Sequence, residues 1–357
     1  MHHPLFSRRS AGLSALALIL AAGTVAPAHA ETAISADRCE ANKAAGKITF
    51  LTSFAYAATL GILDVVAAKE RGLFDDLCLD VAIEPGSTNS QLVSANTAQI
   101  AGVGSASDVM VAIDNGADIV GVATYGNVGA IELLTMADSG IEELKDFEGK
   151  TVGYKGAIAP QFSAMMLDNG VDMGKINWVS VGYDPTILPN GNVQGLGAYK
   201  SNEPKVLEAK GNSVKEWDPD AYGVHSTFNA MIANKQWAAK NPTAIEDFLR
   251  AEFKAFDWIN ESDANLDEAL SYAEKLSTSG YDVKQSKVRW QTELALMQGS
   301  LPEGMMPGQQ SDAQWQPEAD MLVRFNLVKA APDIETAQDN TYIDAIYADG
   351  ALVWPAP

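Results

Sequence analysis

A short run of small polar residues, "GSASD" at 104–108, interrupts an apolar stretch that then resumes with helical spacing. Three kinds of chemistry use such a break. A phosphate-binding loop requires a lysine that reaches the phosphates, and none follows Gly104. A nucleophile elbow requires Gly-x-Ser-x-Gly, but position 109 is Val. The third possibility is a ligand held by Ser105 and Ser107 at a helix N-terminus. From the spacing alone, an ordinary helix cap and a ligand contact both stay open.

Similar small, polar and aromatic loops follow several other segments that read as strands. Ligands bind outside the carboxyl ends of parallel strands, so these loops are expected to converge on one cleft. A single tyrosine in such a loop is better explained by packing, and only the clustering favours a ligand site. We therefore predict ligand contacts from Ser53, Phe54, Tyr56, Ser87, Ser105, Ser107, Tyr125, Asn127, Tyr154, Tyr183, Asp184, Asn202 and Glu203.

Residue types that carry out catalysis are scarce in this chain. Three of its four histidines lie in the first 30 residues, which leaves His225, and no metal-ligand spacing of His or Cys occurs. No glycine-rich dinucleotide fingerprint follows a strand, so we expect neither a cofactor nor a metal. An exported enzyme with a carboxylate pair stays an alternative. In that case, replacing Glu203 or Asp184 should abolish turnover but leave binding measurable.

The first 30 residues have the pattern of an export signal. Arg8 and Arg9 precede the apolar run "LSALALIL", and "APAHA" ends at Ala30 with the small residues that signal peptidase requires. The twin arginines also fit the route for folded proteins, but Ala11 stands where a bulky apolar residue is usual, which favours the ordinary secretory route. No lipid-attachment cysteine stands at the cleavage site, so we predict a free periplasmic protein.

Composition restricts the partners of the exported chain. Without Arg8 and Arg9, 23 basic residues face 46 acidic ones, a formal net charge of −23. A chain this acidic repels nucleic acid and anionic lipid surfaces, so neither is an expected partner. The 327 residues that follow position 30 are enough for two lobes.

The only two cysteines, Cys39 and Cys78, both follow the predicted signal. An even count and an oxidising compartment predict a disulfide between them, although two buried thiols are the alternative. The bond would join the start of the mature chain to the strand "LCLDVAI".

Strand and helix patterns alternate from Lys47 onward, which predicts βαβ units and an α/β fold. A second such block follows, and the sequence after it is helical to near the end. We predict two lobes, each a mostly parallel sheet flanked by helices. The first comprises 31–126 and 229–357, including a helical C-terminal part, and the second comprises 127–228.

The order of several pieces resembles the extracytoplasmic solute-binding proteins of ABC transporters. The pieces are "AAKERGLF" before "LDVAI", "AGVGSASDVMVAIDNGADIVGVATYG", "LKDFEGKTVGY", "SNEP" and "NPTAIEDFLRA". The resemblance is to the branch of nitrate, sulfonate and thiamine-precursor binders, the NMT1/THI5-like and SsuA-like proteins. It implies a two-lobe periplasmic-binding-protein fold of type II that closes by a hinge on a small solute. It also implies a monomer that delivers this solute to a membrane permease.

The residues in the predicted cleft bear on the solute. Aromatic rings, together with amide and carboxylate side chains such as Asn202 and Glu203, suit a flat heterocycle that carries amino groups. An aminopyrimidine of the thiamine-precursor type is therefore the first expectation. Sulfonate, taurine or nitrate is the alternative, although only Lys155 and Lys200 are basic in these loops. Alanine at both Ser105 and Ser107 should weaken solute binding with little effect on the melting temperature.

Overall fold

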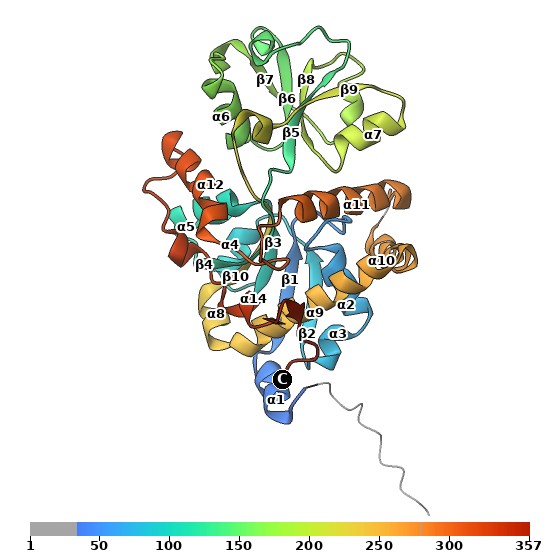
Figure 1. Ribbon diagram of the computed structural model, residues 1–357, viewed down its shortest axis with the longest axis vertical. Helices are drawn as coiled ribbons and strands as arrows, with labels where there is room; N and C mark the ends of the chain where they lie inside the picture. Colours follow the sequence, from blue (N-terminus) through green and yellow to red (C-terminus); the bar gives the residue numbers. More distant parts are fainter. Residues whose placement is uncertain (1–33, 279) are drawn as a thin grey trace, which may run out of the picture. The chain divides into compact units, whose positions relative to one another are not determined.

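The computed structural model describes residues 34–278 and 280–357, and its strands form two separate five-stranded sheets (Figure 1). Sheet A has the order β2-β1-β3-β10-β4 and sheet B has the order β7-β6-β8-β5-β9. The strands of sheet A are β1 (Lys47–Thr52), β2 (Asp80–Pro85), β3 (Ile100–Val103), β4 (Ile119–Gly126) and β10 (Phe228–Asn234). Those of sheet B are β5 (Ile131–Met136), β6 (Thr151–Tyr154), β7 (Asn177–Ser180), β8 (Gly195–Tyr199) and β9 (Val214–Trp217). A hairpin of β11 (Tyr347–Ala348) and β12 (Ala351–Leu352) lies near the C-terminus.

Each sheet is mostly parallel, as the sequence predicts, and each contains one strand that runs against the others. In sheet A, β10 is antiparallel to β3 and β4, whereas β1 is parallel to β2 and β3. In sheet B, β5 is antiparallel to β8 and β9. Both exceptions are the first strands after the chain passes from one sheet to the other. The predicted lobe boundaries at 126/127 and 228/229 stay a prediction.

Helices cover the two sheets. We call sheet A and its helices the sheet-A region, and sheet B and its helices the sheet-B region. The helices of the sheet-A region are α1 (Ala36–Ala44), α2 (Leu63–Glu70), α3 (Leu73–Asp76), α4 (Asn89–Ser94), α5 (Ala106–Asp114), α8 (Lys235–Lys240), α9 (Pro242–Glu261), α10 (Asp263–Leu276), α11 (Val283–Ser300), α12 (Asp312–Arg324), α13 (Ile334–Ala337) and α14 (Thr341–Asp344). The sheet-B region has α6 (Pro160–Asp168), α7 (Glu203–Ala209) and four 3-10 turns, η1 (Leu144–Phe147), η2 (Met173–Lys175), η3 (Pro185–Ile187) and η4 (Pro219–Tyr222). Of the helices that the structure describes, six directly follow strands: α2, α4, α5, α6, α7 and α8.

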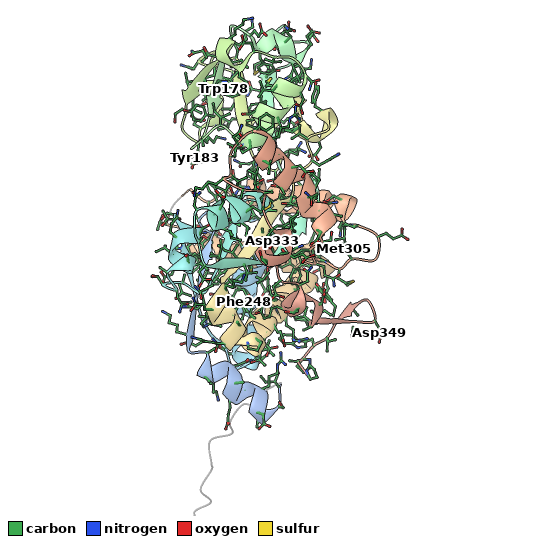
Figure 2. All side chains as sticks on the ribbon, turned by 90° about the vertical axis from the view of Figure 1, so that its left-hand side faces the viewer. Trp178, Tyr183, Phe248, Met305, Asp333 and Asp349 are labelled. Carbon is green, nitrogen blue, oxygen red and sulfur yellow. A yellow bond between two sulfur atoms is a disulfide. The ribbon has the colours of Figure 1, made fainter. Side chains whose placement is uncertain are left out.

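The largest apolar core of the described residues lies between sheet A and the helices α2, α9 and α10. Phe248 of α9 occupies its interior, with its ring 5.6 Å from that of Phe50 and 5.1 Å from that of Phe74 (Figure 2). All three side chains are fully buried. Each contributes roughly 1.5–3 kcal/mol through burial, so α9 holds β1 and α3 in place. A second core, containing Trp315, covers the opposite face of sheet A.

The helical segment after β1 is divided into α2 and α3. Gly72 has a φ of +74°, in the left-handed region, where it ends one helical turn and precedes α3. Glycine adopts this conformation without a steric penalty, so the chain turns here and delivers Phe74 to the core. Sequence analysis did not predict α1, which Arg38 anchors through ion pairs to Glu246 and Asp247 of α9.

The predicted disulfide between Cys39 and Cys78 is present, with the two Cα atoms 5.3 Å apart. It joins α1 to the turn before β2. Cys78 is not in a flexible tail, because it has a φ of +59° and its backbone N–H donates to the carbonyl of Asp75. The bond therefore closes a loop whose two ends are both ordered elements.

Replacing both cysteines with serine is expected to lower the free energy of unfolding by about 3–4 kcal/mol, because the cross-link restricts a loop of 39 residues in the unfolded chain. Urea unfolding of the variant and of the parent protein measures the difference. Parent protein treated with a reductant serves as the control and should approach the variant. Equal unfolding midpoints for all three samples would contradict the expectation.

Within the described residues, no helix is both long and apolar enough to cross a membrane. The predicted signal peptide, residues 1–30, lies outside the residues that the structure describes.

Candidate ligand-binding site

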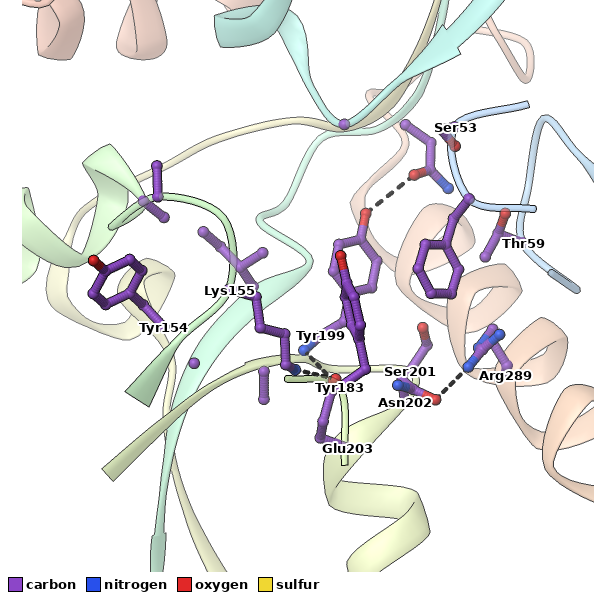
Figure 3. Close-up of a pocket in the computed structure, with 18 of the residues that line it drawn as sticks. Ser53, Thr59, Tyr154, Lys155, Tyr183, Tyr199, Ser201, Asn202, Glu203 and Arg289 are labelled. Atoms are coloured by element: carbon purple, nitrogen blue, oxygen red, sulfur yellow. Dashed lines mark hydrogen bonds and ion pairs between the residues drawn. The ribbon is translucent and has the colours of Figure 1, made fainter. Parts of the chain in front are cut away.

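A cavity of about 350 Å³ lies where loops of the sheet-A region meet loops of the sheet-B region (Figure 3). Five aromatic rings line it: Phe54, Tyr154, Phe162, Tyr183 and Tyr199. Its polar lining comprises Ser53, Thr59, Lys155, Ser201, Asn202, Glu203, Asn229 and Arg289. The loops after β1, β3, β6, β7 and β8 all contribute, in agreement with the rule that ligands bind at the carboxyl ends of parallel strands.

Two of the aromatic rings are unusually exposed for their size. Phe54 of the loop after β1 is 49% exposed, and Tyr183 of the loop after β7 is 67% exposed. Their centroids are 5.7 Å apart, with the planes tilted by 53°. Large rings are normally buried, and these two exposed rings come from loops that belong to different sheets. Figure 2 shows Tyr183 at the margin of the sheet-B region, away from its core.

Both cations of the cavity are already bonded to side chains of the loop that leads from β8 into α7. Lys155 forms an ion pair with Glu203, whose side chain is 3% exposed. The Oε2 atom of Glu203 also accepts a hydrogen bond of 2.7 Å from the backbone N–H of Tyr199. Arg289 of α11 donates to the Oδ1 atom of Asn202. These bonds, drawn in Figure 3, tie Lys155 and Arg289 to the 199–203 turn.

Tyr199 links the cavity to the strand β10. Its hydroxyl donates to the Oδ1 atom of Asn229, 3.1 Å away. Burial raises the pKa of Tyr199 well above its ordinary value, and the nearby carboxyls of Glu293 and Asp108 raise it further. The phenol therefore stays neutral and acts as a hydrogen-bond donor at physiological pH.

Thr59 leaves one polar group of the cavity wall without a partner. Its side chain is 9% exposed, and its Oγ1 atom forms no hydrogen bond with any described residue. A buried hydroxyl without a partner costs about 1–3 kcal/mol, and a ligand in this cavity could supply the missing bond. The hydroxyl can donate or accept, so it does not by itself select the sign of the ligand group.

Six of the predicted site residues lie together on this cavity: Ser53, Phe54, Tyr154, Tyr183, Asn202 and Glu203. Four others line neighbouring cavities. Ser105 and Ser107 lie on one of about 460 Å³, Ser87 on one of about 720 Å³ and Tyr56 on one of about 450 Å³. The remaining three, Tyr125, Asn127 and Asp184, line none of these cavities.

Local interactions explain where those three residues lie. Strand β4 runs through Gly126, so Tyr125 belongs to the strand and is buried in the core. There its hydroxyl donates to Glu252 and its ring stacks on Phe253. Asp184 accepts hydrogen bonds from the backbone N–H and the hydroxyl of Thr186, so it caps η3, and these bonds lower its pKa. Asn127 is exposed, and its backbone N–H donates to Ser300.

The side chain of Ser107 is engaged by a buried carboxylate of α12. Glu318, fully buried, accepts hydrogen bonds from the backbone N–H and the hydroxyl of Ser107. It accepts two more, each of 2.6 Å, from the backbone N–H and the hydroxyl of Thr227. Ser105 is the N-cap residue of α5, but its side chain makes no capping bond. The expectation that alanine at both serines would spare stability is therefore revised, because Ser107 belongs to a buried network.

Seven of the aromatic and polar residues that line the cavity were not among the predicted contacts: Thr59, Lys155, Phe162, Tyr199, Ser201, Asn229 and Arg289. Thr59 closes the loop "TSFAYAAT", so a signal for it was present in the sequence. Arg289 stands in the middle of α11, more than 80 residues after the loop that it contacts. No local pattern marks it, because only the packing of α11 brings it to the cavity.

His225 lies apart from the cavity described above. His225 is largely exposed, with Nδ1 3.2 Å from the Oδ1 atom of Asp220, and it lines none of the cavities described above. In the part of the chain that the structure describes, no group of three or more His, Cys, Asp or Glu side chains is placed to hold a metal ion.

Comparison with solved structures places the fold among periplasmic binding proteins. The periplasmic aliphatic sulphonate-binding protein SsuA from Escherichia coli is similar, with a TM-score of 0.61 and 15% identity over 82% of this chain and 91% of that one. The periplasmic nitrate-binding protein NrtA from Synechocystis PCC 6803 has a TM-score of 0.56 and 12% identity, over 84% and 87%. At these identities, the likeness concerns the fold alone.

The desulfurization enzyme DSZB has a similar fold. A mutant of DSZB in complex with biphenyl-2-sulfinic acid has a TM-score of 0.57 and 11% identity, over 84% of this chain and 97% of that one. The fold therefore does not by itself separate binding proteins from enzymes.

Sequence comparison identifies the family. No curated protein sequence matches the chain significantly. The family profile described as "NMT1/THI5 like" matches residues 61–264, which include most of sheet A, all of sheet B and the Phe54-facing ring Tyr183. Because this match covers more than half of the 357 residues, the chain belongs to the NMT1/THI5-like family.

Proposed function

We propose that this protein is the periplasmic solute-binding component of an ABC importer, which captures a flat, amino-bearing heterocycle between its two sheet regions. The observation that carries the proposal is the exposed pair of Phe54 and Tyr183, whose rings are in contact from the loops after β1 and β7 and which line the cavity with three further aromatic rings. A planar ring inserted beside them would cover apolar surface that water now contacts, and it would stack on the two faces.

The charges of the cavity support an amino-bearing solute. Lys155 is neutralised by Glu203, and Arg289 is bonded to Asn202. Besides burial, the carboxyls of Glu293, Asp108 and Glu203 raise the pKa of Tyr199, whereas Arg289 lowers it. An exocyclic amino group could donate to Glu203 or to Thr59, whose hydroxyl lacks a partner. An aminopyrimidine of the thiamine-precursor type meets these requirements.

An anionic solute, such as a sulfonate, taurine or nitrate, is the second candidate. Arg289 and Lys155 favour it, because both present N–H donors at the cavity wall. Such a solute would have to compete with Asn202 and Glu203 for these donors. The two candidates therefore differ in whether binding keeps or breaks the Lys155–Glu203 ion pair.

Capture by closure follows from the way the chain connects the two sheets. Residues 127–130 join β4 to β5, and residues 218–227 join β9 to β10. Short passages of this kind allow two regions to move about a hinge, and a solute that contacts both stabilises the closed form. We propose that the closed, loaded protein is a monomer that docks on a membrane permease. Adjacent genes for a permease and an ATPase would support this role.

Mass spectrometry of ligand released from protein purified without refolding tests the function most directly. Calorimetric titration should then show saturable binding of 4-amino-5-hydroxymethyl-2-methylpyrimidine and much weaker binding of taurine and nitrate. The reverse order of affinities would replace the heterocycle with an anion. Steady formation of product from the bound solute would show an enzyme instead, and loss of that turnover in Glu203→Gln with binding retained would locate its chemistry.

A further inference from the structure

Three side chains of α11 form a stripe against the loop that carries the ligand residues of sheet B. Gln285, Arg289 and Glu293 are spaced by four residues, so they lie on one face of the helix. Gln285 and Arg289 both donate to Asn202, to its backbone carbonyl at 3.5 Å and to its side chain. Glu293 accepts a hydrogen bond of 2.9 Å from the hydroxyl of Ser201. The stripe is thus a direct link between the two sheet regions.

Glu293 is the buried end of this stripe. Its side chain is fully buried, and its Oε2 atom accepts hydrogen bonds of 3.0 Å from the backbone N–H of Leu60 and from the Nδ2 atom of Asn229. Each partner of Glu293 belongs to the cavity or adjoins it. Leu60 follows Thr59, Asn229 holds the hydroxyl of Tyr199, and Ser201 itself lines the cavity. Glu293 therefore joins elements that must be correctly placed for the cavity to exist.

Asn229 is held by several hydrogen bonds in the group around Glu293. It has a φ of +48°, a left-handed conformation that asparagine tolerates better than most residues. Its side chain donates to the carbonyl of Leu60 at 3.1 Å and to Glu293, and it accepts from Tyr199. A strained backbone conformation persists only where surrounding bonds hold it, and here Glu293 supplies one of them.

We propose that Glu293 is a positioning residue of the ligand site, a buried carboxyl whose bond to Ser201 forms when the two regions close, so that closure on the solute takes up a proton. This proposal rests on the closure described under the proposed function. It concerns a group that does not line the cavity and that the solute does not touch.

The environment of Glu293 determines whether acid favours or opposes closure. Burial raises its pKa from 4.5 to about 7, although the bonds from Leu60, Ser201 and Asn229 and the charge of Arg289 act in the opposite direction. The other titratable group that it faces is Tyr199, of strand β8. When the loop that carries Ser201 withdraws, water reaches the carboxyl and its pKa falls toward the ordinary value.

Closure is then linked to protonation of Glu293 at pH values between its ordinary pKa and its raised pKa in the closed form. The closed form binds one more proton than the open form in the range from about pH 5 to pH 7, so solute affinity should increase as the pH falls through this range. A linkage of one proton changes affinity by at most about tenfold per pH unit. We therefore expect binding to be on the order of tenfold tighter at pH 5.5 than at pH 7.5.

The test compares the parent protein with Glu293→Gln. A glutamine keeps the shape, accepts from Leu60 and Asn229 through its oxygen and donates to Ser201 through its amide. Calorimetric titration of the aminopyrimidine is carried out at several pH values, in two buffers with different ionisation enthalpies. On binding, the parent protein should take up more protons than the variant, and its affinity should rise more steeply as the pH falls. Any titration of the solute itself is common to both proteins and cancels in the comparison. The exposed Glu303→Gln is the matched control and should behave like the parent protein.

A second measurement needs no solute. Dyes on Lys210→Cys and Lys240→Cys, two exposed positions in the sheet-B and sheet-A regions, report the distance between the regions by energy transfer, since the native cysteines are paired. Acid should shorten this distance in the parent background and leave it unchanged with Glu293→Gln. Failure of every solute to bind would reject the proposed ligand but not this response. A pH-independent distance in the parent background, or an unaltered response in the Gln variant, would overturn the role of Glu293.

Discussion

Tyr183→Ala is expected to weaken binding of the aminopyrimidine by roughly 30-fold while leaving the empty protein as stable as before. The ring is 67% exposed and makes its aromatic contact with Phe54, so its loss removes little that the fold requires. In the variant, the ligand no longer buries this ring or stacks on it. The two contributions together amount to about 2 kcal/mol of binding free energy, which corresponds to this change in affinity. Calorimetric titration measures the affinity, and thermal unfolding measures the stability.

Tyr222→Ala is the matched control, because Tyr222 is also partly exposed but lines none of the cavities. It should leave both quantities within experimental error. Phe54→Ala should resemble Tyr183→Ala, and the double variant should lose less than the sum, since rings in contact are energetically coupled. An unchanged affinity in Tyr183→Ala, or a large loss of stability, would show that the pair serves packing and not a ligand.

Glu318→Ala is expected to lower the free energy of unfolding by about 3–5 kcal/mol, the largest stability effect that we predict for a side chain outside the apolar core. The substitution leaves buried donors of Ser107 and Thr227 without an acceptor. It also opens a void beneath α5. Urea unfolding monitored by circular dichroism measures the change.

Two substitutions with smaller expected effects provide the comparison for Glu318→Ala. Ser107→Ala removes one donor and leaves the backbone bond to Glu318, so it should cost about 1 kcal/mol. Asp320→Ala, at an exposed position of the same helix, should have an effect below about 0.5 kcal/mol. If Glu318→Ala were no more destabilising than Asp320→Ala, the network would not contribute to stability as described.

Much of the fold follows from local sequence patterns. Hydrophobic periodicity distinguishes strands such as β1 and β10 from helices such as α9, and glycine and polar residues mark the turns between them. The disulfide followed from the even count of cysteines and the predicted export, and it is present. The direction of β5 and β10 was not predictable in the same way, because alternation of side chains does not depend on whether a strand runs parallel or antiparallel.

The candidate site was predictable only in part, for reasons that individual residues show. Phe54 and Tyr183 lie on the cavity because they follow strands, which a local pattern reveals. Tyr125 lies in the core because it is part of strand β4, which ends at Gly126, and a strand end cannot be located to within a residue from sequence. Asp184 has a similar sequence context to the other loop residues, but its carboxylate caps its own turn by accepting a hydrogen bond from the backbone N–H of Thr186.

By itself, the sequence determined the alternation of strands and helices, the acidic character, the disulfide and the family, because each depends on residues close in the chain or on composition. Only the tertiary structure decided which loops share a cavity and which charges meet there. Arg289 and Glu293 come from a helix that begins more than 70 residues after β8, and Glu318 reaches Ser107 across 211 positions. Such contacts depend on how whole helices pack on the sheets, and hydrophobic periodicity specifies the face that packs but not the polar partner that it meets.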